Sequence, residues 1–143
     1  MLYCTNIESI YNKVYVDIKK VLCLQSAASF LGLSRGLGIP MKFYYVSDEN
    51  IINSSYLLGL KRDTLDSIRT VSVRGIECTS KEYTIIDLII NCDMVDDQII
   101  YESLARYYFE NNEDISSLVK ILPDGLQSRF NYYLEGAATY YDE

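Results

Sequence analysis

The sequence predicts an α+β fold, with a small mixed or antiparallel sheet in the middle of the chain and a helical C-terminal half. Residues 41–46 are rich in aromatic and β-favouring side chains, which is typical of a strand. Two apolar segments, 68–73 and 76–78, flank Arg74-Gly75 as the strands of a β-hairpin flank their turn. Beyond residue 79, apolar residues recur at helical spacing. Because strands and helices are segregated along the chain, we expect α+β rather than alternating α/β architecture.

Helices are also expected ahead of these strands. Asn6 can cap a helix over residues 7–18, where apolar side chains have helical spacing. Ser26 is the expected N-cap of a short helix of small residues, which Gly32 ends as the first residue after the C-cap. The pattern leaves residues 51–66 undecided between strand and loop.

Four helices are expected in the C-terminal half. Thr79 and Glu82 have the spacing of a capping box, in which each side chain binds the other residue's backbone N–H. Asp96 and Asp114 have suitable side chains for capping the next two helices. The last helix is expected over about residues 125–134, followed by a fraying C-terminal tail.

Length and composition indicate one globular domain, residues 1–143. A chain of 143 residues is of ordinary size for one domain, and 49% hydrophobic with 23% charged residues is an ordinary composition. The N-terminal segment lacks a basic region followed by an apolar one, so we expect no signal peptide. No apolar run approaches the length of a membrane-spanning helix. A cytoplasmic protein is expected.

The residue types present argue against an enzyme. Histidine is absent, which removes the imidazole bases and Ser-His-Asp or Cys-His pairs of many catalytic sites. The four cysteines, Cys4, Cys23, Cys78 and Cys92, form no C-x-x-C pair, and buried free thiols are expected. Neither a Walker A nor a G-x-G-x-x-G motif occurs. We therefore predict no catalytic residues, no metal and no cofactor.

Charge is distributed unevenly along the chain. Residues 1–81 hold ten Lys and Arg against seven Asp and Glu, a balance of +3, and residues 82–143 hold three against thirteen, a balance of −10. The acidic half repels phosphate, so weak or no nucleic-acid binding is expected. The predicted hairpin region is basic and can contact an acidic partner, or its charges can simply protect a sheet edge. Its basic residues are Lys61, Arg62, Arg69 and Arg74.

Three blocks resemble a known family. Residues 26–34, S-A-A-S-F-L-G-L-S, are similar to a family pattern S-A-L-x-x-x-G-L-S. Residues 75–89, G-I-E-C-T-S-K-E-Y-T-I-I-D-L-I, are similar to G-x-x-V-T-S-P-E-R-T-I-V-D-L-L, and residues 129–135, R-F-N-Y-Y-L-E, to R-L-x-Y-L-L-E. In this order and spacing the blocks, which cover about residues 21–135, resemble AbiEi-type antitoxins of abortive-infection (type IV toxin–antitoxin) systems.

The resemblance implies an antitoxin domain that neutralises a nucleotidyltransferase-type toxin, by direct binding or through a functional effect, in phage defence. Family members often carry an N-terminal winged helix that binds operator DNA, whereas only about twenty residues precede the resemblance here. Lys81 and Tyr83 stand where the family has proline and arginine. The alternatives are a DNA-binding regulator of its own operon and a mobile-element inhibitor of another host protein.

The candidate binding residues are the basic residues of the hairpin region together with two residues of the following helix. Tyr83 takes the place of the family's arginine, and Asp87 lies inside an apolar helix, where a hydrogen bond to Arg69 or Arg74 is expected. Four adjacent tyrosine pairs occur in the chain. Since neighbours on a helix or strand face different ways, one tyrosine of each pair is expected near the surface.

Overall fold

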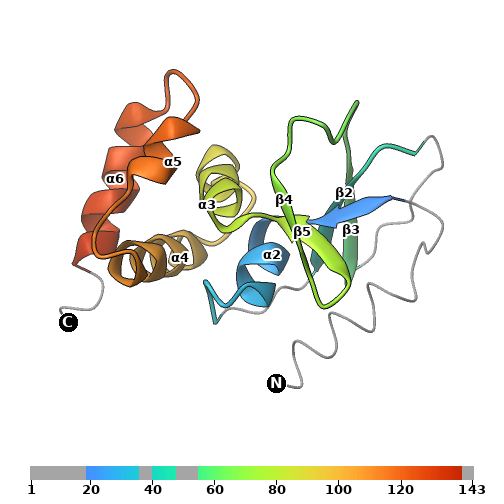
Figure 1. The fold of residues 1–143 in the computed structure, drawn as a ribbon, viewed down its shortest axis with the longest axis horizontal. Helices are drawn as coiled ribbons and strands as arrows, with labels where there is room; N and C mark the ends of the chain where they lie inside the picture. The colour runs from blue at the N-terminus through green and yellow to red at the C-terminus, as the bar shows by residue number, and fades with distance from the viewer. Residues whose placement is uncertain (1–18, 36–39, 48–54, 140–143) are drawn as a thin grey trace.

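The computed structural model describes residues 19–35, 40–47 and 55–139. A sheet and a group of helices occupy opposite ends of the molecule, with the short helix α2 between them (Figure 1). The helix expected at residues 7–18 and its cap Asn6 lie outside the described residues. The elements are β1 (Lys20–Leu22), α2 (Leu24–Phe30), β2 (Met41–Tyr45), β3 (Leu57–Lys61), β4 (Thr70–Val73), β5 (Ile76–Thr79), α3 (Lys81–Ile90), α4 (Asp97–Glu110), α5 (Ser116–Lys120) and α6 (Gln127–Ala138).

The sheet is mixed and has the strand order β3-β2-β1-β5-β4. Its central strand β1 pairs antiparallel with β2 and parallel with β5. The α+β prediction with a helical C-terminal half is therefore confirmed. The sheet is not confined to the predicted region 41–78, because β1 supplies its centre. A buried strand of three residues is too short to show a periodic sequence pattern.

The predicted hairpin is present as β4 and β5. Val73 pairs with Ile76, which leaves Arg74 and Gly75 as the two turn residues. Their φ angles are 52° and 78°, both positive, as a type I′ turn requires. Arginine accepts this conformation less readily than glycine, so the turn depends chiefly on Gly75. Residues 51–66, left undecided by the sequence pattern, contain the edge strand β3.

Helix α2 begins two residues before Ser26, so the prediction that Ser26 caps it is wrong. Ser26 lies within the helix, and its Oγ accepts a hydrogen bond of 2.8 Å from the backbone N–H of Lys42. The predicted end of the helix is confirmed. Gly32, at φ 77°, donates to the carbonyl of Ser29 at 3.2 Å, and Leu33 donates to that of Ala28 at 2.8 Å. These bonds form a Schellman motif.

The N-cap of α3 is Ser80, not Thr79. Strand β5 extends through Thr79, so the helix begins one residue later than predicted. Ser80 Oγ accepts from the N–H of Tyr83 at 3.2 Å. The hydroxyl of Thr79 instead forms a buried hydrogen bond of 2.5 Å with that of Thr84. Glu82 does not form the predicted capping box either, because its carboxylate accepts a hydrogen bond of 3.0 Å from the hydroxyl of Tyr107 on α4.

Asp96 caps α4 as predicted, and its side chain accepts from the N–H of Gln98 at 3.0 Å. The prediction that Asp114 caps α5 is wrong by one residue, because the N-cap is Ile115; Asp114 lies just before it and accepts from the N–H of Ser116 at 2.9 Å. The predicted tail starts too early, because α6 continues to Ala138; residues 140–143 of that tail lie outside the described residues. Gly136 lies directly against the ring of Tyr101 on α4, where a Cβ atom would collide with that ring.

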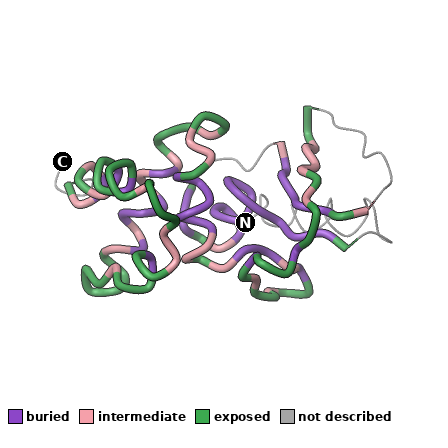
Figure 2. The backbone as a smooth tube through the Cα atoms, turned by 90° about the horizontal axis from the view of Figure 1, so that it is seen from above, coloured by how far each residue is buried: buried purple, intermediate pink, exposed green. Residues whose placement is uncertain are grey.

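The buried stretches of the chain meet in the middle of the molecule (Figure 2). Tyr44 belongs to a core shared with α3, α4 and α6, whereas Tyr45 belongs to a second core with Phe30 and Phe43. Both faces of β2 are thus buried, and the prediction of one surface tyrosine fails for this pair. It holds for Tyr132, which is 62% exposed beside buried Tyr133.

Candidate functional site

Asp87 projects from α3 into the core and is only 4% exposed. Its carboxylate accepts a hydrogen bond of 2.6 Å from the hydroxyl of Tyr44 and one of 3.1 Å from the side chain of Asn91. Burial raises the pKa of Asp87 to about 6, although these two bonds and the charge of Arg62 oppose the increase. The prediction that Asp87 forms a hydrogen bond with Arg69 or Arg74 is wrong, because the carboxylate faces β2 rather than the hairpin.

Arg62, directly after β3, is the cation whose charge acts on Asp87. Its guanidinium lies 4.7 Å from the centroid of the Tyr44 ring, a cation–π arrangement. Arg62 also interacts with the side chain of Tyr83 on α3. The β3–β4 connection is therefore held against α3 by Arg62, between two tyrosines and a buried carboxylate.

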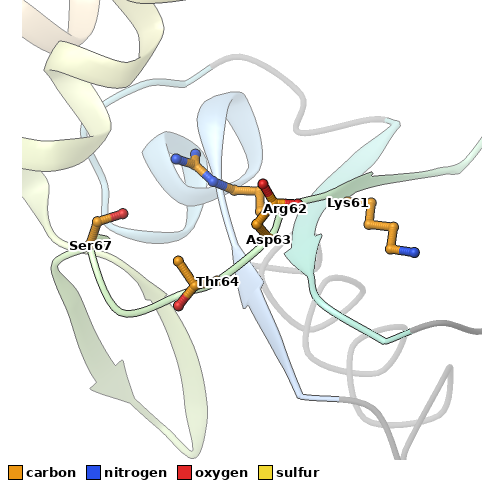
Figure 3. Close-up of a pocket in the computed structure, with 5 residues that line it drawn as sticks. All are labelled: Lys61, Arg62, Asp63, Thr64 and Ser67. Carbon is orange, nitrogen blue, oxygen red and sulfur yellow. The ribbon is translucent and has the colours of Figure 1, made fainter.

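A first hollow opens beside this connection (Figure 3). In the close-up the side chains of Lys61 and Arg62 extend in opposite directions, as neighbours at the end of a strand do. Only Arg62 points toward the helices. The hollow is polar and open to solvent, and its lining residues are Lys61, Arg62, Asp63, Thr64 and Ser67.

Two further hollows follow the first, each sharing one lining residue with the hollow before it. The second has a volume of about 210 Å³ and shares Ser67 with the first. The third shares Arg69 with the second and extends to Ser80, Glu82, Ser117 and Lys120. We call the three together the basic groove. The second hollow is lined by Ser67, Arg69, Tyr83, Ile86, Asp87, Ile90, Ile121 and Pro123.

Most of the predicted binding residues meet in the basic groove. Lys61, Arg62, Arg69, Tyr83 and Asp87 all line it. Arg74 does not belong to this set of lining residues. Arg69 precedes the four-residue strand β4 and Arg74 follows it, so they lie at opposite ends of the strand. The guanidinium of Arg74 lies 4.6 Å from the centroid of the Phe30 ring.

Lys120 and Ser67 were not predicted from the sequence. Lys120 is the last residue of α5 and reaches the groove because α5 packs near α3. A single lysine on a short helix has no sequence signal that links it to a hairpin some fifty residues away. Ser67 lies in the β3–β4 connection, where the sequence pointed to a binding site only through the neighbouring basic residues.

The residues of the three family-like blocks have mainly structural roles. Ala28 of α2, Ile85 of α3 and Phe130 of α6 share one hydrophobic core. Arg129 of α6 donates to the carbonyls of Ile89 and Ile90 at 3.4 Å, and so satisfies acceptors at the C-terminal end of α3. The blocks thus form one packed unit, and the middle block also supplies part of the groove lining, namely Ser80, Glu82, Tyr83, Ile86 and Asp87.

The described cysteines are free thiols. Cys23 and Cys78 are buried free thiols, as predicted, whereas Cys92 is half-buried. Burial raises the pKa of the Cys23 thiol well above its usual value, which disfavours the reactive thiolate. Over residues 19–35, 40–47 and 55–139, no three His, Cys, Asp or Glu side chains are grouped so that they could hold a metal ion. In the same part of the chain, no helix has the length and apolar character needed to cross a membrane.

Comparison with models of known protein families finds none that matches this chain, and comparison with curated proteins likewise finds no match.

Proposed function

We propose that this protein acts by binding a protein partner, as an antitoxin-like inhibitor of a nucleotidyltransferase-type toxin. The observation that carries the binding role is the convergence of Arg62, Arg69 and Tyr83 in one groove, to which the fold adds Lys120. The antitoxin assignment rests on the resemblance of the three sequence blocks. Their joint packing around α3 supports it, because blocks that build one core are expected to keep their order and spacing together.

The small enclosed volume and the open basic parts of the groove favour a macromolecular partner over a small substrate. The enclosed part has about 210 Å³, less than the roughly 300–1,000 Å³ typical of pockets for drug-sized ligands. The basic side chains lie in the open parts of the groove, where a large partner can reach them. A protein that inhibits by contact needs such a surface and no catalytic group.

Co-expression tests the proposal. The protein is produced together with a nucleotidyltransferase encoded beside its gene, and growth is measured with and without it. Restored growth is expected for the wild type, and reduced rescue for Arg69→Glu, which reverses a charge in the groove. Arg74→Glu makes the same change at the other end of β4 and should rescue like the wild type.

Thermal melting of both variants separates a binding defect from unfolding, since exposed substitutions usually change stability by less than about 0.5 kcal/mol. Absence of rescue by the folded wild-type protein would refute the antitoxin proposal. Equal rescue by both arginine variants would refute the groove as the site of action.

A further inference from the structure

We infer that the basic groove binds an acidic segment of a partner protein, with one apolar side chain of that segment inserted into the second hollow. This inference deepens the proposed function and rests on its premise that the chain binds a protein. It does not depend on which protein the partner is.

The second hollow is suited to a single apolar side chain. Ile86, Ile90, Ile121 and Pro123 supply its apolar lining. Ile90 is 40% exposed, so apolar surface is accessible to a partner at this point. A volume of about 210 Å³ accommodates one aliphatic or aromatic side chain, whose burial removes apolar surface from water on both molecules. The hollow therefore favours an anchoring residue such as leucine, isoleucine, methionine or phenylalanine.

Cations lie on both sides of this hollow. Lys61 and Arg62 line the first hollow, and Arg69 and Lys120 line the third. A segment that places its apolar residue in the centre would therefore bring its flanking residues near positive charge. Acidic residues at those flanking positions are favoured by charge complementarity.

The carboxylates of the groove do not cancel this preference. Asp87 accepts hydrogen bonds from Tyr44 and Asn91 inside the core, and Glu82 accepts one from Tyr107. Both carboxylates are thus directed toward protein donors. Asp63 is the one exposed carboxylate among the lining residues, against the three exposed cations Lys61, Arg69 and Lys120. The charge offered to a partner at this groove is therefore positive.

The same features favour protein over nucleic acid. A phosphate backbone would use the cations but has no group for an apolar hollow. The chain as a whole carries a net charge of −7, and the half that contains α3 to α6 carries most of the negative charge. Long-range repulsion therefore opposes a polyanion, whereas a short acidic segment experiences chiefly the local cations.

A random peptide library displayed on phage provides the test. The wild-type protein is used to select peptides, and the enriched sequences are synthesised and measured by fluorescence anisotropy. We expect enrichment of an aliphatic or aromatic residue flanked on both sides by Asp or Glu. Replacing the central apolar residue of the selected peptide by serine should weaken binding about tenfold, because the anchor's burial is lost.

Two matched pairs of variants locate the binding. Ser67 lies where the first and second hollows join, so Ser67→Trp should obstruct the groove and weaken the peptide about tenfold, while Ser67→Ala should bind like the wild type. Arg69→Glu should weaken binding and make it less dependent on salt concentration than binding to the wild type. Arg74→Glu should change neither the affinity nor its salt dependence. Melting curves establish that each variant is folded.

Several outcomes would overturn the inference. Selection of basic peptides, or of no peptide, would do so. Equal binding of the selected peptide to the wild type and to the Ser67→Trp variant would also do so. Displacement of the peptide by duplex DNA at physiological salt would indicate a nucleic-acid surface instead. The growth-rescue experiment is run in parallel. Rescue without peptide selection would refute the groove assignment alone, and peptide selection without rescue would refute the toxin as partner alone.

Discussion

The hydroxyl of Tyr44 on β2 donates a hydrogen bond of 2.6 Å to the carboxylate of Asp87 on α3. The two residues are 43 positions apart in the chain, and their bond joins the sheet to the helical half within the larger hydrophobic core. Asp87 also forms part of the wall of the second hollow. The contact therefore connects the stability of the fold to the shape of the proposed binding groove.

Tyr44→Phe should destabilise the protein by about 1–3 kcal/mol, because it leaves a buried carboxylate without one of its donors. Urea unfolding followed by circular dichroism measures the change. Tyr45→Phe is the matched control on the same strand, since Tyr45 is also buried but belongs to the other core. A loss of stability that is equal for both variants would show that the Tyr44–Asp87 bond contributes nothing specific.

Asp87 should make stability depend on pH. Its pKa is about 6 in the folded protein, against 3.8 for an ordinary aspartate. Between these values the folded state binds more protons than the unfolded state, so the free energy of unfolding falls as pH rises from about 4 to 6. The full change corresponds to about 3 kcal/mol. Asp87→Asn cannot titrate, so this part of the pH dependence should disappear.

The measurement is the difference in the free energy of unfolding between Asp87→Asn and wild type at several pH values. We expect this difference to shift in favour of the variant as pH rises through 4 to 6, and to become constant above it. Taking the difference removes the contributions of the other acidic residues. Parallel curves for the two proteins would contradict the raised pKa of Asp87.

Local sequence signals predicted the features that depend on a few neighbouring residues. The turn at Arg74-Gly75, the helix end at Gly32 and the N-cap at Asp96 each need only a suitable side chain or a flexible backbone at one position. The segregation of strands from helices is also visible in the residue pattern. These features therefore agree between the sequence and the fold.

Features that depend on contacts between residues far apart in the chain could not be predicted from local sequence signals. Ser26 looked like a cap because its hydroxyl suits that role, but a strand 16 residues away takes the hydroxyl instead. Strand β1 has a defined place only because β2 and β5 flank it. In the candidate site, the basic residues were visible in the sequence, whereas Lys120 and the inward orientation of Asp87 follow from the packing of α5 and α3.

Ser80→Ala should cost about 1 kcal/mol, because Ser80 rather than Thr79 caps α3. Ser80→Asp should keep most of the wild-type stability, since its carboxylate can accept from the same N–H and is favoured at a helix N-terminus. Thermal melting of the three proteins provides the comparison. If Ser80→Asp melted as low as Ser80→Ala, the side chain of Ser80 would not be acting as an acceptor.

Whether Gly136→Ala stabilises or destabilises the protein should depend on one neighbouring residue, Tyr101. Glycine inside a helix is usually less stable than alanine by about 1 kcal/mol, so Gly→Ala at such a position is normally stabilising. Here a Cβ atom on Gly136 would collide with the ring of Tyr101, and that ring packs at 5.3 Å between centroids against the buried Tyr133. Gly136→Ala should therefore destabilise the wild-type protein by about 1–3 kcal/mol through overpacking of α4 against α6.

The same substitution should become stabilising, by up to about 1 kcal/mol, in a Tyr101→Ala background, where the obstructing ring is absent. The four proteins of this double-mutant cycle are compared by urea unfolding. Tyr101→Ala itself loses packing, but the cycle subtracts that loss because it is common to both members of the pair. If Gly136→Ala had the same effect in both backgrounds, the close approach of the Tyr101 ring would not explain why glycine occupies this position of α6.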